Sequence, residues 1–305
     1  MDKIQKDLLE KIADLHGTPE GAYNIRSNGA LGGRNTTANI DIVTKTDKQG
    51  IDIIIKPGTR NDSVHIPVII SESGLTDLVY NDFFIGEDSD VVIIAGCGIH
   101  NCGDQKSEHD GIHTFHVGKN AKLKYVEKHY GDGDGNGENI MNPTTVIEID
   151  DGGYMEMETT QIKGIDSTKR VTTAKLGNDA KVVIKEKLMT HGSQFAETEF
   201  TVDLDGENSG ANVISRSVAK DKSKQIFLSR INGNNKCSGH TECDAIIMDD
   251  ATVAAIPEIT ANHIDAALIH EAAIGKIAGE QLIKLMTLGL TEQEAEEQIV
   301  SGFLK

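Results

Sequence analysis

Cysteine and histidine residues that could bind a metal gather in two short stretches of this sequence. In the first, Cys237 and Cys243 flank His240 within KCSGHTECD, directly before the strand-like run AIIMD. Thiolates and an imidazole at such short spacing suit a soft metal such as iron or zinc. The spacing is not that of a zinc ribbon, so two buried cysteines beside a solvated histidine are the simpler interpretation.

The second stretch, AGCGIHNCGDQKSEHDGIHTFHVG, holds half of the four cysteines and four of the 11 histidines. Its candidate ligands are Cys97, Cys102, His100, His109, His113 and His116. Neutral imidazole is the commonest metal ligand in proteins. A metal site and a polar turn with solvent-facing histidines therefore explain this stretch about equally well.

A third candidate is the pair His270 and Glu271, in the segment DAALIHEAAIGKIAGEQLIKLMTLG. Apolar residues at helical spacing predict a helix here, with the pair at the border of its apolar stripe. Such a border is usually structural, although imidazole and carboxylate can both ligate iron. Gly289 is expected to end this helix, and a Thr291-x-x-Glu294 capping box predicts a second one.

Other motifs exclude several functions. The loop YGDGDGNGEN has the first three ligand positions of a calcium-binding EF-hand, but its twelfth position is Pro143 rather than glutamate, so we expect a turn. The sequence has no GxxxxGK[ST] phosphate-binding loop and no GxSxG serine elbow.

Composition and charge narrow the choice further. The 305 residues include 48 acidic and 30 basic ones, for a net charge of -18. Neither a nucleic-acid surface nor a polybasic membrane contact is expected of such a chain. Because there is no apolar run of membrane-spanning length and no signal-peptide pattern at the N-terminus, we predict a cytoplasmic protein with reduced thiols.

The pattern of elements predicts three segments. Residues 1–34 contain a helix up to about residue 20, residues 35–262 carry short β-branched runs separated by Gly, Asn and Asp turns, and residues 263–305 are expected to be helical. Evenly spaced short strands are compatible with a sandwich, a barrel or a β-helix. The repeated unit of a turn followed by five or six alternating residues favours a β-solenoid.

The C-terminal sequence closely resembles the SufB/SufD family of iron–sulfur cluster assembly scaffolds. The resemblance rests on ECDAIIMD, a following Pro-Glu, HEAAIGKI, QL-x-x-LM-x-x-GL and a terminal IV-x-GF, and it extends more weakly through METTQIKGIDSTKR. It implies a right-handed parallel β-helix with a C-terminal helical subdomain. It also implies a homodimer formed through the β-helix, a SufC-like ABC ATPase bound at the C-terminal helices, and apo iron–sulfur proteins as recipients.

The resemblance also assigns roles to individual residues. Cys243 matches the cluster-site cysteine of the family, Glu271 its acidic partner, and His270 the neighbouring histidine. We add Cys237 and Cys97 as further ligands because iron–sulfur clusters favour thiolates. The expected cargo is a transient [4Fe-4S] cluster, with [2Fe-2S] possible, held near the dimer interface by Cys243, Glu271 and Cys237. No nucleotide is expected on this chain, and ATP hydrolysis is expected in the partner.

Two departures from the family pattern leave alternatives open. The chain is short, and the region VVIKEKLMTHGSQF lacks the sulfur-accepting cysteine of SufB members, so persulfide delivery along the β-helix is not expected. A SufD-like structural partner without its own cluster is one alternative. A β-helix carbohydrate-active enzyme is another, disfavoured by an aromatic content of only 4%.

Overall fold

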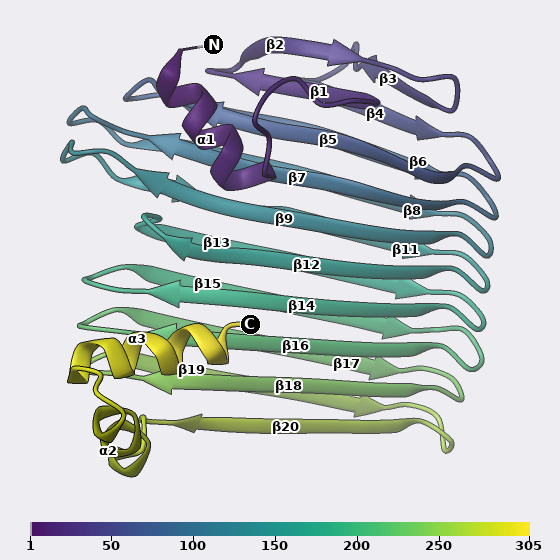
Figure 1. The fold of residues 1–305 in the computed structure, drawn as a ribbon. Helices are drawn as coiled ribbons and strands as arrows, with labels where there is room; N and C mark the ends of the chain where they lie inside the picture. The colour runs from purple at the N-terminus through teal and green to yellow at the C-terminus, as the bar shows by residue number, and fades with distance from the viewer. Residues whose placement is uncertain (1) are drawn as a thin grey trace.

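The computed structural model describes residues 2–305 and shows a β-solenoid, as predicted, in place of a sandwich or a closed barrel (Figure 1). Successive strands alternate between two sheets, and within each sheet the strands run parallel and in register over most of the length. The first sheet comprises, in spatial order, β2 (Ala30–Asn35), β1 (Ala22–Ser27), β5 (Arg60–Ile70), β7 (Asp90–His100), β9 (Lys122–Asp132), β12 (Tyr154–Lys163), β14 (Lys181–Thr190), β16 (Gly210–Ala219), β18 (Ser238–Ile247) and β20 (Ala267–Gly275). The second comprises β3 (Ile40–Thr44), β4 (Gly50–Ile55), β6 (Thr76–Ile85), β8 (Ser107–Val117), the pair β10 (Asn139–Met141) and β11 (Thr144–Ile149), β13 (Ser167–Leu176), β15 (Phe195–Leu204), β17 (Lys224–Gly233) and β19 (Thr252–Ala261).

The turns between strands are made by the Asn and Asp residues that mark them in the sequence. These residues adopt positive φ, a conformation that Asn and Asp tolerate better than most side chains. Several of these turns stack on the equivalent turn of the preceding coil, meaning one full circuit of the solenoid. For example, the Asn208 amide donates to the Asp179 carboxylate at 3.3 Å. The turn residues at positive φ include Asp88, Asn120, Asp179, Asn208, Asp221 and Asp249.

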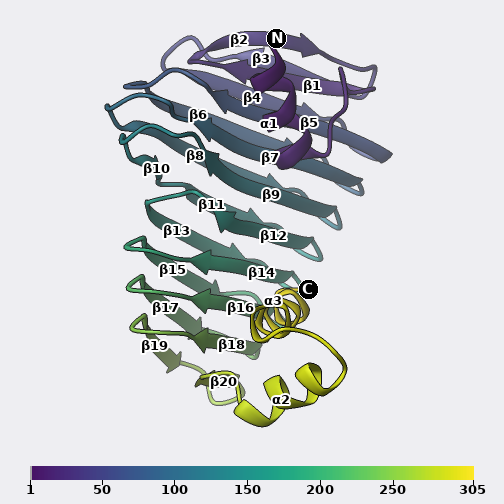
Figure 2. The ribbon, with the colours of Figure 1, turned by 60° about the vertical axis from the view of Figure 1, so that its left-hand side comes forward.

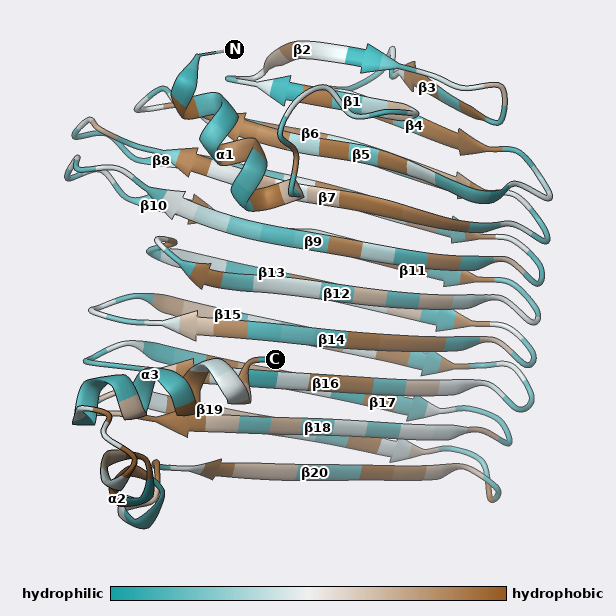
Figure 3. Cartoon of the chain, viewed as in Figure 1, coloured by the Kyte–Doolittle hydropathy of each residue, from teal (hydrophilic) through white to brown (hydrophobic). Residues whose placement is uncertain are grey.

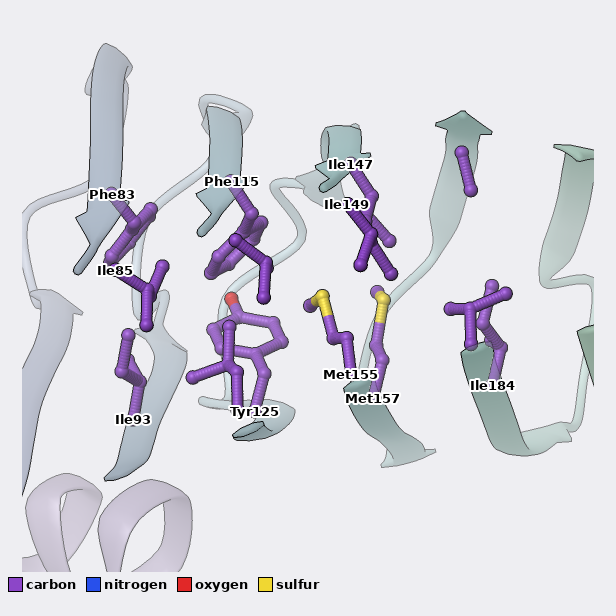
Figure 4. Packing of buried hydrophobic residues seen from close by; sticks show 14 of the residues in the cluster. Phe83, Ile85, Ile93, Phe115, Tyr125, Ile147, Ile149, Met155, Met157 and Ile184 are labelled. Carbon is purple, nitrogen blue, oxygen red and sulfur yellow. The ribbon is translucent and has the colours of Figure 1, made fainter. Parts of the chain in front are cut away.

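The core is a column of side chains between the two sheets. Apolar and polar residues alternate along the strands (Figure 3), so every second side chain points inward. Figure 4 shows the inward residues stacked from turn to turn, including Phe83 and Phe115, whose rings stack at 4.4 Å. Among residues 2–305, no helix combines the length and the apolar composition needed to span a bilayer.

Helix α1 (Lys3–Ala13) covers the outer face of the first sheet at its N-terminal end (Figure 1). An Asp2–Gln5 capping box starts the helix, and Leu8 and Ile12 are buried against β5, β7 and β9. The predicted N-terminal helix is thus confirmed, but it ends at Ala13. The rest of segment 1–34 contains β1 and β2, and β1 already pairs in parallel with β5 as part of the solenoid.

The C-terminal end differs from the prediction. The helix expected from about residue 264 is wrong over its first half: Ala267–Gly275 forms β20, in register with β18, and the solenoid therefore continues beyond residue 262. Pairing with an existing strand outweighs the helical spacing of the apolar residues. Only then do α2 (Gly279–Thr287) and α3 (Glu292–Phe303) follow, the latter with the predicted Thr291–Glu294 capping box. Figure 2 shows both helices beside the last turns.

Candidate metal site on the last two strands of the first sheet

The candidate ligands at the C-terminal end lie on β18 and β20, the last two strands of the first sheet. The two strands pair in parallel, with Glu242 beside Glu271 and Cys243 beside Ala272. Since neighbouring residues of a strand point to opposite faces, Cys243 faces the core whereas Glu242 and Glu271 face outward. His270 and Glu271 are therefore separated by the sheet itself, and they do not share one side of a helix.

On the outer face, His240, Glu242 and Glu271 form one cluster of donor atoms. One donor atom from each residue lies within 4.8 Å of those of the other two. His240 Nε2 is 3.5 Å from Glu271 Oε2, and His240 Nδ1 donates to Asn212 Oδ1 at 3.0 Å. This hydrogen bond leaves Nε2 as the nitrogen with the free lone pair, directed toward the carboxylates. An orienting partner of this kind is typical of histidines that bind metals.

The electrostatics of this outer cluster also favour a cation. Burial and the neighbouring Asp244 raise the pKa of Glu242. A divalent cation would compensate the repulsion among these carboxylates. One imidazole and two carboxylates suit a first-row ion such as Fe²⁺, Mn²⁺ or Zn²⁺.

On the inner face, Cys243 is only 1% exposed. Burial, with smaller contributions from Glu186 and Asp244, raises the pKa of the Cys243 thiol to about 12. The thiol is therefore protonated near neutral pH, and a metal would have to displace its proton in order to bind. Ser215 occupies the neighbouring position on β16 and donates to Glu186 at 2.8 Å, so the thiol lies beside a short polar track.

His270 faces the same side of the sheet as Cys243. It pairs with the inward-facing Thr241, two residues from Cys243 along β18. Burial lowers the pKa of His270, which favours the neutral imidazole, and its buried Nδ1 has no hydrogen-bond partner within residues 2–305. A neutral imidazole with an unpartnered nitrogen near a thiol fits a soft metal or an iron–sulfur cluster.

The remaining predicted ligands lie elsewhere. Cys237 immediately precedes β18 and is buried in the core, where burial raises its pKa. Cys97 lies on β7, five strands from β18 in the same sheet, or about 24 Å at the usual strand spacing. The structure therefore brings Cys243 and His270 to one face and Glu271 to the other, and it places Cys97 outside both groups.

Sequence reasoning missed Glu242, and it did not connect His240 with Glu271. The signal was present in the H-x-E spacing of His240 and Glu242, because residues two apart on a strand share a face. It could be recognised only once the neighbouring segment was known to be a strand instead of a helix.

The second cysteine- and histidine-rich stretch is divided among separate places. Cys97, His109 and His113 line one internal cavity with Glu127 and His129, and His100 Nε2 lies 3.0 Å from Sγ of the exposed Cys102. His109 and His113 are buried inside the solenoid, whereas His116 points outward and contacts Glu148 at 2.8 Å. His113 Nδ1 is 2.9 Å from the Tyr125 hydroxyl. The expectation of solvent-facing histidines is thus wrong for two of the four, because alternation along β8 turns them into the core.

Comparison with known proteins gives one consistent result. Residues 76–303 match the family model described as "SUF system FeS cluster assembly, SufBD core domain". An iron–sulfur cluster assembly SufBD family protein of Methanocaldococcus jannaschii is 32% identical over 258 residues, covering 83% of this chain and 79% of the relative. A relative from Archaeoglobus fulgidus with the same description is 32% identical over 85% of this chain and 69% of its own length. A relative from Methanothermobacter thermautotrophicus is 30% identical over 84% of this chain and 62% of its own length.

Proposed function

Because the chain belongs to the SufBD family of iron–sulfur cluster assembly proteins, we propose that it is a scaffold on which a cluster is built and from which the cluster is passed to apo proteins. The cluster is cargo, most simply a [4Fe-4S] unit, with [2Fe-2S] as the smaller alternative. The chain itself supplies ligands and does not hydrolyse ATP.

The observation that carries this proposal is the arrangement of donors on β18 and β20. The inner face offers the Cys243 thiol and the His270 imidazole, and the outer face offers the donor cluster of His240, Glu242 and Glu271. Both sets lie at the last strands of the solenoid, where only one further strand separates Cys243 from the end of the sheet.

The donor types suit a ligand set that must release what it holds. Thiolate and imidazole bind iron firmly, whereas carboxylates are harder and more labile ligands. We propose that iron first meets the outer nitrogen and oxygen donors and that the cluster forms around Cys243. Cys237 remains a candidate thiolate because it precedes the same strand, and Glu271 can join Cys243 only if the edge strand β20 moves.

We propose that the working unit is a homodimer joined through the open end of the solenoid. Strands β19 and β20 are the last of their sheets, so each presents one edge of unpaired backbone groups. Their inward-facing Ile259 and Ile274 are 41% and 40% exposed. A second copy stacked on this end would cover these side chains and enclose the cluster site.

We propose that helix α2 receives a SufC-like ABC ATPase. No residue of α2 is buried, and its Ile283 and Met286 are 61% and 42% exposed. By contrast, Val300 of α3 and Leu304, which directly follows α3, pack against the solenoid. An exposed apolar helix next to one that is packed on the solenoid suits the binding of a partner protein. ATP-driven motion of that partner would be transmitted to the strands that hold Cys243.

The test is the content of iron and acid-labile sulfide per chain after anaerobic reconstitution. We expect stoichiometric iron and sulfide in the wild type and their loss in Cys243→Ser. The matched control is Cys102→Ser, because Cys102 is exposed and lies far from β18. Glu271→Gln should slow iron loading more than it lowers the final cluster content.

Two outcomes would contradict this proposal. Equal, small amounts of iron in the wild type and Cys243→Ser would favour a SufD-like structural partner. If Cys102→Ser lost the cluster and Cys243→Ser kept it, the cluster site would lie near Cys102 and not at Cys243.

A further inference from the structure

A second candidate site lies at the opposite end of the molecule, in a cavity between the first strands of the two sheets. The cavity has a volume of about 190 Å³ and is lined mainly by β1, β2, the β3–β4 loop and the neighbouring parts of β5 and β6. Its lining includes four basic residues, Arg26, Arg34, Lys45 and Lys48, and no carboxylate. In a chain with 48 acidic and 30 basic residues, this local excess of positive charge runs against the composition.

Two of the four basic residues are neutralised from behind the cavity wall. Arg26 donates to both carboxylate oxygens of Asp77, with the shortest distance 2.7 Å. Lys45 forms ion pairs with Asp52 and Asp82, the latter at 2.7 Å. These pairs hold the wall in place, and their carboxylates do not enter the cavity.

Arg34 has no such counter-charge. Its Nε donates to Asn24 Oδ1 at 2.8 Å, and its Nη1 donates to Thr44 Oγ1 at 2.8 Å. Both acceptors are neutral, and within residues 2–305 no acceptor faces Nη2, which carries two further N–H donors. Burial without a carboxylate lowers the pKa of Arg34, which means that its charge lacks compensation.

Lys48 also lines this cavity, but its ammonium lies over the ring of Tyr80, which faces outward on β6 between the inward-facing Val79 and Asn81. Lys48 lies 4.6 Å from the centre of the Tyr80 ring and forms no ion pair among the described residues. The buried amides of Asn24 and Asn81, which are 9% and 8% exposed, also line the cavity. A guanidinium held by neutral acceptors and buried amides are features of oxyanion sites, and the lining also includes an ammonium without an ion pair among the described residues.

From this geometry we propose that the N-terminal cavity binds a small oxyanion of more than one negative charge, through Arg34 and Lys48. A phosphate group or a small polycarboxylate fits this chemistry. Nη2 of Arg34 donates to the anion, the exposed Lys48 side chain turns from the Tyr80 ring to supply the second charge, and Arg26 and Lys45 shape the wall. This site is independent of the cluster site, which lies at the other end of the solenoid.

The test is titration calorimetry of the full chain with inorganic phosphate and, separately, with citrate. Saturable binding of either anion is expected, and the tighter one identifies the source of the oxyanion. Arg34→Gln should weaken binding at least tenfold, and Lys48→Gln severalfold. The matched controls are Arg60→Gln and Lys222→Gln, both exposed and outside the cavity, which should bind as the wild type does.

Lys48→Gln guards against misfolding, because Lys48 is exposed and is not part of the buried core. Absence of saturable binding of both anions would overturn the proposal. So would equal losses in Lys48→Gln and Lys222→Gln, since that result would mean general charge attraction. Cluster assembly should be unaffected in Lys48→Gln, which separates this test from that of the scaffold function.

Discussion

The two ends of the solenoid differ in how well the inward-facing side chains of their last strands are covered. At the N-terminal end, β3 is the last strand of its sheet, yet its inward-facing Ile40 and Ile42 are 0% and 5% exposed. At the C-terminal end, β19 occupies the equivalent place, and its inward-facing Ile259 is 41% exposed. Antiparallel hairpins form the first end, with helix α1 on the outer face of the neighbouring strands, whereas α2 and α3 lie beside the second (Figure 2).

This difference shows that the chain itself covers the N-terminal end and leaves the C-terminal end uncovered. A stacked coil needs a cap at each end, because an uncovered last coil exposes apolar side chains and unpaired strand edges. The N-terminal hairpins β1–β2 and β3–β4 supply one cap within the chain. At the C-terminal end, the helices lie beside the last strands and do not cover them. The candidate ligands on β18 and β20 lie next to this uncovered end. We infer that this end is built for contact with another subunit.

The largest expected effect on stability concerns an ion pair that is buried in the interior of the solenoid. Arg170 donates to Glu127 at 2.7 Å, and both residues are 3% exposed. Arg170→Met should lower the free energy of unfolding by about 3–5 kcal/mol, because it leaves a buried carboxylate uncompensated. Denaturant unfolding measures the change.

The control for that substitution lies on the open end. Arg230 pairs with Glu258 at 2.6 Å, but both side chains are nearly half exposed. Arg230→Met should cost no more than about 1 kcal/mol in the isolated chain. Equal costs for the two arginines would break the contrast between the closed interior and the open end.

The next effect compares the terminal strands directly. Ile40→Ala should cost about 2–5 kcal/mol, because it empties a fully buried position. Ile259→Ala should cost less than about 1 kcal/mol in dilute monomer, since its side chain is already partly in water. Unfolding at several protein concentrations should show the Ile259 cost growing once copies associate. A cost that does not depend on concentration would argue against stacking at this end.

A smaller effect tests how α1 covers its sheet. A Cβ at Gly96 would lie 2.8 Å from the backbone oxygens of Ile12 and Lys128, so Gly96→Ala should cost about 1–3 kcal/mol and expose the helix to proteolysis. At Gly275, on the open end, a Cβ meets nothing within 4 Å, and Gly275→Ala should change stability by no more than about 0.5 kcal/mol. Thermal unfolding and limited proteolysis compare the two.

The smallest effect is on the reactivity of the thiol near the open end. The Cys243 pKa rises from 9.0 to about 12 on folding, so the folded chain holds this proton while the unfolded chain loses it. Its contribution therefore lowers stability as pH rises between about 9 and 12, and Cys243→Ala should flatten that part of the profile. Near pH 8, iodoacetamide should modify the exposed Cys102 well before Cys243. Rapid modification of Cys243 in the isolated chain would contradict its burial.

Much of the fold and some of the site were predictable from local patterns. Alternating residues between Asn, Asp and Gly turns predicted the solenoid, and the C-terminal motifs predicted the SufBD family; both are confirmed. The helix over residues 264–278 was wrong, because apolar residues such as Ile269 and Ile274 fit both periods. The neighbouring strand β18 resolved the ambiguity by offering backbone partners in register.

The sequence by itself determined the kinds of donor at the C-terminal end, because Cys243, His270 and Glu271 are recognisable from their motifs alone. Only the tertiary structure decided which donors meet. A change from helix to strand moves neighbouring residues from one flank of a helix to opposite faces of a sheet. That change separates Glu271 from Cys243, joins it to His240 and Glu242, and leaves His270 on the same face of the sheet as Cys243.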